Sequence, residues 1–210
     1  MSEFRESLQP DCYYHIYNDA NGIEKLFNGE SDYFYFILRL RKYIQPIADI
    51  LSYYLQPDRF HIVIQVKSEI QIIELLRKRL TPEQFTEQCS KDCFLEKKLS
   101  RICSNFFNSY AKKFNLTHGR SGNLFKRAFR RESIQDIGDL RTLINEIHHI
   151  PVYNGFVRKP ESWEYSSFTS LVADKVNLLK PEKVWQVFGS KENFIDLHQK
   201  KLDLILGGNK

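Results

Sequence analysis

Short apolar runs separated by turn residues predict three β-strands in the first third of the chain. Aromatic and β-branched residues favour strands, whereas Gly, Pro, Asn and Asp bound them. Residues 12–18 (CYYHIYN) are followed by the turn signal Asn21-Gly22, and residues 60–66 (FHIVIQV) form an apolar run typical of a buried strand. Residues 47–55 are separated from that run by the Pro57-Asp58 turn. The second and third strands are therefore expected to form a hairpin.

Apolar residues three and four positions apart predict amphipathic helices around these strands. Asp32 is placed to cap the first helix, and Pro46 is expected to close it. Pro151 is expected to end a later helix, because proline lacks the backbone donor that a helix interior needs. Residues 118–122 form a glycine turn, and residues 124–133 are expected to form a strand or ribbon. The predicted helices cover residues 32–44, 70–80, 95–115, 137–149, 181–188 and 191–206.

This order of elements predicts an α+β protein with a ferredoxin-like sandwich and a mainly antiparallel sheet, followed by C-terminal helices. We assign residues 1–170 to one domain and residues 171–210 to a helical tail. The sequence leaves open whether the tail packs on the domain or reaches a second subunit. Its helix around residues 194–206 is a candidate surface for a homodimer.

Composition places the chain among ordinary globular proteins rather than membrane or disulfide-rich secreted ones. No apolar run approaches the roughly 18 residues that a membrane span needs, and the N-terminus lacks the apolar core of a signal peptide. A cytoplasmic location is expected. Zinc binding by Cys89, Cys93, Cys103 and His118 would require a spacing that no common zinc module has, so reduced cysteines are expected.

The positive charge is concentrated in residues 97–131, which contain ten Lys or Arg and no Asp or Glu. Aromatic residues are interleaved with these cations, and the combination is typical of nucleic-acid grooves. The alternative is ordinary surface charge on a helix and a ribbon. Only alternate residues of a ribbon share a face, so about half of the ribbon cations are expected to reach a ligand. The DNA-contact candidates are Arg120, Lys126, Arg127, Arg130 and Arg131, with Lys112 and Lys113 from the long helix.

Four motifs in order resemble one known family. Residues 14–18 (YHIYN) resemble YHVYNR, residues 57–63 (PDRFHIV) resemble PNHVHLL, and residues 119–125 (GRSGNLF) resemble GRSGHLW. Residues 147–152 (IHHIPV), with the later WEYSS at 163–167, resemble IHLNPVRAGL followed by WPWSS. Over about residues 10–170 the chain thus resembles the single-tyrosine, HUH-type transposases of insertion sequences and REP elements.

The resemblance implies a ferredoxin-like fold around single-stranded or hairpin DNA. Active members hold a divalent metal with two histidines of an H-x-H pair, because alternate residues of a strand share a face. A tyrosine on a later helix attacks the scissile phosphate, and a polar residue one turn further completes the site. The product is a covalent phosphotyrosine. Mg²⁺ or Mn²⁺ is the implied cofactor of an active member.

This chain departs from that pattern at three of the four catalytic positions. Arg59 replaces the first histidine and only His61 remains, Glu146 replaces the tyrosine, and Ile150 replaces the polar residue. An arginine cannot be deprotonated to bind a metal. We therefore expect a DNA-binding protein that has lost strand cleavage. The alternatives are an RNA-binding derivative, or an active transposase or nickase with a rebuilt site in which Tyr153 or Tyr110 is the nucleophile.

Two readings of the substituted site stay open. Arg59 can bind the phosphate that the metal once held, or it can form a salt bridge with Glu146, which we favour. His61 is a vestigial ligand or a satisfied core histidine. His148 and His149 are expected to complement the helix dipole. Trp163 with Tyr165 is expected to anchor packing.

Overall fold

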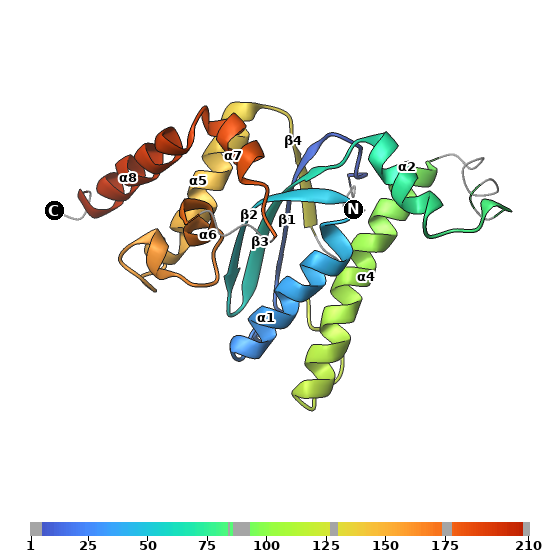
Figure 1. Cartoon of the computed structure of the whole chain (residues 1–210). Coiled ribbons are helices and arrows are strands. Elements are labelled where there is room, and N and C mark those ends of the chain that lie inside the picture. The colour runs from blue at the N-terminus through green and yellow to red at the C-terminus, as the bar shows by residue number, and fades with distance from the viewer. Residues whose placement is uncertain (1–5, 84, 86–92, 127–129, 174–177, 208–210) are drawn as a thin grey trace.

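The computed structural model describes residues 6–83, 85, 93–126, 130–173 and 178–207, and it is built around one four-stranded antiparallel sheet. The strands lie in the order β2-β3-β1-β4 (Figure 1). Strands β2 and β3 form the predicted hairpin. The expected α+β class is therefore confirmed. The strands are β1 (Tyr13–Asp19), β2 (Ala48–Gln56), β3 (Arg59–Val66) and β4 (Arg130–Ile134).

Helices cover both faces of this sheet. Helices α1 and α4 lie together on one side, whereas α5 to α8 lie on the other (Figure 1). The stripe of apolar residues along α4 is buried against α1 and the sheet, with the ring of Phe107 stacked 5.5 Å from that of Phe60. The helices are α1 (Glu30–Arg39), continued by the π-helical turn Leu40–Ile44, α2 (Glu69–Arg77), α4 (Phe94–Thr117), α5 (Ile137–Tyr153), α6 (Phe168–Val172), α7 (Pro181–Phe188) and α8 (Lys191–Gly207), with a 3-10 turn at Pro160–Ser162.

Alternation in the central strand β1 gives its two sides different roles. Tyr14, Ile16 and Asn18 are buried on the side of α1 and α4, whereas the residues between them are only partly buried. Because successive side chains of a strand point to opposite faces, the second face presents every other residue of the YHIYN motif. This second face carries the candidate site.

The outer edge of β2 is closed by later parts of the chain. The backbone N–H of Leu55 donates to the carbonyl of Tyr165 at 2.9 Å, and that of Ser167 donates to Tyr53 at 2.9 Å. Further along, Lys180 donates to Ile50 at 3.1 Å. Trp163 donates from its indole to the carbonyl of Leu55 at 3.0 Å, consistent with the expected packing anchor.

Two predicted helix ends are wrong. Gly29, not Asp32, is the N-cap of α1, because the Asp32 carboxylate accepts from the backbone of Asn28 and contacts His118. Helix α5 continues through Pro151 to Tyr153. Pro151 is buried in its last turn, where few backbone bonds remain to be lost.

The tail packs on the rest of the chain. Phe194 of α8 is fully buried in the same apolar cluster as the sheet residues. His198 Nε2 lies 2.9 Å from Nδ1 of His148 on α5. None of the helices in the described ranges is both long and apolar enough to cross a membrane. The division at residue 170 stays a prediction.

Candidate nucleic-acid interface

Three rings stand side by side on the second face of the sheet. Tyr17 of β1 is paired with His61 of β3, and His15 precedes Tyr17 by two positions, so all three side chains share this face. The ring centroids of His15 and Tyr17 are 4.6 Å apart, and those of Tyr17 and His61 are 6.0 Å apart with planes only 7° from parallel. The YHIYN motif therefore contributes to the site directly. Sequence reasoning placed only His61 there, although the alternation within the motif indicated the other two.

The two histidines of this site bind each other. His15 Nε2 and His61 Nδ1 are 3.0 Å apart, a hydrogen bond in which one ring donates and the other accepts. Burial lowers the pKa of His15 to about 4. The pKa of His61 falls to about 3 through burial, followed by repulsion from His15 and Arg59. Both rings are therefore neutral at pH 7.

Strand β4 adds one cation and one carboxylate next to Tyr17. The Tyr17 hydroxyl donates to the Glu132 carboxylate, and the guanidinium of Arg130 lies 5.6 Å from the centre of the Tyr17 ring. Burial and then the Glu132 hydrogen bond raise the pKa of Tyr17. The hydroxyl is thus held in its protonated form at neutral pH.

The favoured salt bridge between Arg59 and Glu146 is wrong. Arg59 binds Asp58 at 3.2 Å and lies 3.9 Å from Asp19, and its side chain is 43% exposed. Glu146 instead forms an ion pair with Lys201 of α8. The cause is the rotation of α5, which turns Glu146 toward the tail. The Nε of Arg59 is buried without a hydrogen-bond partner, so this guanidinium is only partly satisfied.

We call the sheet face that carries His15, Tyr17 and His61 the ring face. Neither tyrosine proposed as a substitute nucleophile lies on it. Tyr110 is buried between α4 and α1, and its hydroxyl donates to the carbonyl of Leu26 at 2.5 Å. Burial strongly raises its pKa, so Tyr110 is a core residue. Tyr153 is half exposed at the end of α5, where the Lys201 ammonium lies 5.8 Å from its ring centre. Ile150 is partly buried and packs against the core.

The basic candidates fall into distinct settings. Arg120 is largely buried and binds Glu24 at 2.9 Å and Asn115 at 2.7 Å, so it holds the glycine turn together. Arg130 and Arg131 point to opposite faces, as alternation requires, and only Arg130 reaches the ring face. Arg127 lies outside the described residues. The remaining candidates, all exposed, are Lys126, which follows the ribbon residue Phe125, and Lys112 and Lys113 on α4.

The residues of this face do not fit the divalent metal of the active family. Mg²⁺ and Mn²⁺ prefer oxygen ligands and tolerate few imidazoles without a carboxylate. His61 is bound to His15, Arg59 brings a positive charge, and no group of three potential ligands occurs in the described part of the chain. The zinc grouping fails as well, because Cys93 and His118 flank opposite ends of α4, about 36 Å apart at 1.5 Å per residue.

His148 and His149 are buried, which corrects their expected role at the helix dipole. His148 Nε2 contacts the hydroxyls of Ser52 at 3.0 Å and Ser167 at 2.7 Å. His149 contacts the backbone carbonyls of Asn145 and His198. Burial lowers the pKa of both rings, so they are neutral and cannot act as cations. They fasten α5 to β2 and α8.

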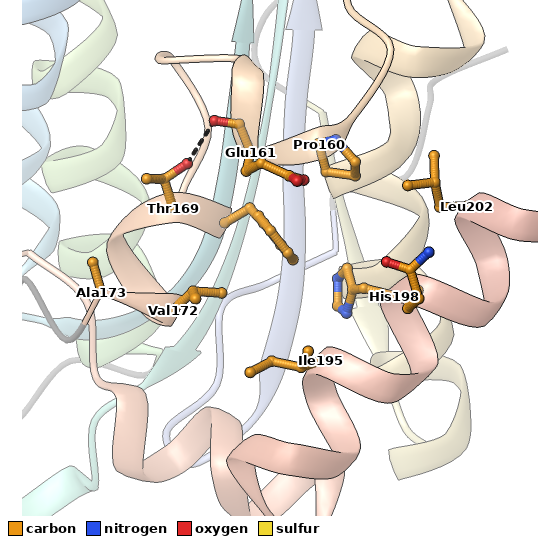
Figure 2. A pocket seen from close by; sticks show the side chains of 10 residues that line it. Pro160, Glu161, Thr169, Val172, Ala173, Ile195, His198 and Leu202 are labelled. Atoms are coloured by element: carbon orange, nitrogen blue, oxygen red, sulfur yellow. Dashed lines mark hydrogen bonds between the residues drawn. The ribbon is translucent and has the colours of Figure 1, made fainter.

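An apolar cavity of about 270 Å³ lies between α6 and α8 (Figure 2). Phe168, Val172, Ile195 and Leu202 line it, and His198 is at its wall. Both His198 nitrogens are already bound, to Phe194 and to His148. None of the three ring residues lines this cavity, and His198 has no ring nitrogen left to offer a ligand there.

Comparison with known proteins agrees with the resemblance found in the motifs. A putative REP-associated tyrosine transposase of Haemophilus influenzae is 29% identical over 112 residues, which are 53% of this chain. The match covers 54% of that protein, so the chain spans about half the length of the curated relative. The solved structure of a REP-associated tyrosine transposase bound to a REP hairpin has a TM-score of 0.57 at 17% identity, covering 84% of this chain and 88% of that one. It shares the fold. No family model matches the chain.

Proposed function

We propose that this chain is a transposase-like protein that binds single-stranded or hairpin DNA and no longer cleaves it. The motif resemblance, the similarity to a putative REP-associated tyrosine transposase and the shared fold support the class of protein. The similar solved transposase is bound to a REP hairpin, and we extend that class of ligand to this chain. We place the activity in the cytoplasm.

One observation carries the proposal. The ring face has aromatic rings and cations that suit DNA binding, but its described residues lack the tyrosine nucleophile and the pair of metal-binding histidines that cleavage requires. Tyr17 and His61 lie beside Arg59 and Arg130, a combination suited to bases and phosphates. The position that resembles the tyrosine nucleophile is Glu146, which is paired with Lys201 away from the face.

The loss of cleavage follows from the absence of a suitable nucleophile and of metal ligands among the described residues of this face. Attack on phosphorus needs a nucleophilic oxygen next to a polarised phosphate. Burial and the Glu132 hydrogen bond raise the pKa of the Tyr17 hydroxyl, Tyr110 is buried, and Tyr153 lies at the end of α5, off the ring face. With the metal ligands also replaced, binding can persist where bond cleavage cannot.

The deciding experiment incubates the purified protein with labelled single strands, imperfect hairpins and matched duplexes in the presence of Mg²⁺ or Mn²⁺. A native gel scores retention, and a denaturing gel scores cleavage and covalent protein–DNA bands. We expect retention of single strands or hairpins over duplex, with no cut. A covalent band would refute the loss of chemistry, and equal retention of all three DNAs would refute the class of ligand.

We also propose that the protein forms a homodimer through α8. Helix α8 exposes Ile195, Leu204 and Leu206, which suits a self-association surface. Light scattering of the protein with and without hairpin DNA measures its mass directly. A monomer under both conditions would remove the dimer from the proposal.

A further inference from the structure

We infer that the rings of Tyr17, His15 and His61 form a stacking platform for an unpaired base of the bound DNA. The inference rests on the proposed function and names the part of the ligand that this face recognises. It assigns a base-binding role to a face whose resemblance to known transposases implies only metal-dependent chemistry.

The first argument is the position of the rings in the sheet. β1 and β3 are the two central strands of the order β2-β3-β1-β4, and they carry all three rings on the same face. Single-stranded nucleic acids are commonly recognised by aromatic residues on the central strands of a four-stranded sheet, onto which unpaired bases stack. The residues of the opposite face are buried under α1 and α4, whereas the three rings stay partly exposed on the face where α5 packs at β2.

The second argument is the orientation of the rings. The planes of Tyr17 and His61 differ by 7°, those of His15 and His61 by 18°, and those of His15 and Tyr17 by 23°. Core aromatic pairs of this protein include edge-to-face packing, as at Phe36 and Tyr110 with 87° between the planes. The three near-parallel rings are all only partly buried, so a planar base can stack against them and continue the row of rings.

The third argument is the arrangement of charge. Arg130 lies next to Tyr17, and Arg59 lies two residue pairs further along β1 and β3, opposite Asp19. These cations are placed for the phosphates on either side of a stacked nucleotide. Glu132 would repel a phosphate at the Tyr17 hydroxyl, so a base rather than a phosphate is the group that fits there.

Glu132 also gives the platform a preference among bases. A carboxylate accepts several hydrogen bonds, and its natural donors on a base are the exocyclic amino groups of adenine, cytosine and guanine. Thymine has no such group. We therefore expect oligo(dC) and oligo(dA) to bind more tightly than oligo(dT) at the same length and salt concentration.

The test is a double-mutant cycle between the protein and the DNA. Single abasic sites are placed in turn at each unpaired position of a bound hairpin or single strand, and binding is measured by fluorescence anisotropy to wild type, Tyr17→Leu and Tyr17→Phe. One abasic position is expected to weaken wild-type binding by about tenfold, which is the usual range for one stacked base. The same position should cost Tyr17→Leu nothing further. Tyr17→Phe keeps the ring, so its affinity should stay within about twofold of wild type.

The outcomes distinguish failure of the stacking platform from failure of the proposed DNA binding. Wild type that binds none of the DNAs overturns the proposed function and the inference with it. Wild type that binds well, with no sensitive abasic position or with an undiminished loss in Tyr17→Leu, overturns the platform alone. Equal binding of the three homopolymers overturns the role of Glu132, and tighter binding of the matching RNA overturns the choice of DNA. If Tyr17→Leu does not fold, a wild-type abasic series without a sensitive position still overturns the platform.

Discussion

Arg130 and Arg131 are consecutive residues of β4 that serve opposite faces of the sheet. The Arg130 guanidinium lies over the ring of Tyr17, whereas Arg131 donates to the hydroxyl of Ser100 on α4 and to the backbone carbonyl of Glu6. One cation is thus on the proposed DNA face and the other is a structural link on the helical side. The pair offers a matched test within one strand.

Replacing Arg130 by Ala should weaken DNA binding about threefold or more and reduce the salt dependence by about one released counterion, without lowering stability. Replacing Arg131 by Ala should lower the free energy of unfolding by about 1–2 kcal/mol, because its hydrogen bonds are lost. Anisotropy titrations at several salt concentrations and urea unfolding measure the two effects. The reverse assignment of the two losses would show that the faces are misplaced.

Replacing Arg59 by His should create a site for a divalent metal. The new histidine would share a face with His61, two positions along β3, and would lie opposite the carboxylate of Asp19, while a positive charge would be removed. Mn²⁺ is expected to raise the melting temperature of this variant by a few degrees, as for a ligand in excess over its Kd, and to leave wild type unchanged. Arg59→Gln is the control, since it removes the charge without adding a ligand. A metal-induced shift in wild type would contradict our reading of the site.

Replacing Tyr110 by Phe should destabilise the protein without affecting any DNA chemistry. The buried carbonyl of Leu26 would lose its donor, at a cost of about 1–3 kcal/mol. The same change at Tyr153, which is half exposed, should be nearly neutral in urea unfolding. Should wild type form a covalent DNA adduct that disappears in Tyr153→Phe, Tyr153 would be the nucleophile and cleavage would be retained.

Stability should fall as the pH drops from 6.5 toward 4. His15 on the second face of the sheet and His198 on α8 have pKa values below that of a histidine in the unfolded chain, at about 4 and about 3, because burial penalises their charged forms. The unfolded state therefore binds more protons below pH 6.5, so the stabilisation is complete above that value and is lost on acidification. Each such proton contributes up to about 1.4 kcal/mol per pH unit. Urea unfolding at fixed ionic strength and pH 8, 7, 6 and 5 tests this. A flat profile from pH 7 to 5 would contradict it.

Much of the fold could be predicted from the sequence because local signals agree with the tertiary structure. The alternation in residues 13–19 and the apolar run of β3 indicate central strands, and the turn at Pro57-Asp58 specifies the pairing of β3 with β2. Asp32 and Pro151 misled the prediction of helix ends, since each is held by tertiary contacts. The Asp32 carboxylate binds His118, which is 86 positions away, and Pro151 is buried.

The site was harder to predict because it depends on how α5 is rotated on the sheet. Motif spacing indicates which residues stand at the catalytic positions but not which way a helix turns them, and Glu146 faces Lys201 of α8 rather than Arg59. The hydrogen bond between His15 and His61 joins residues 46 positions apart. It becomes visible only once the register of β1 and β3 is known.

The closed edge of β2 has a consequence for how the protein is made. Its backbone partners are Tyr165, Ser167 and Lys180, all more than 100 residues later in the chain. During synthesis the hairpin can form early, yet its outer strand keeps a row of unpaired N–H and C=O groups until those residues leave the ribosome. Such an edge is a template for pairing with other chains. Nascent or truncated chains that stop before residue 165 are thus the form most prone to aggregate, and the last third of the sequence protects the first.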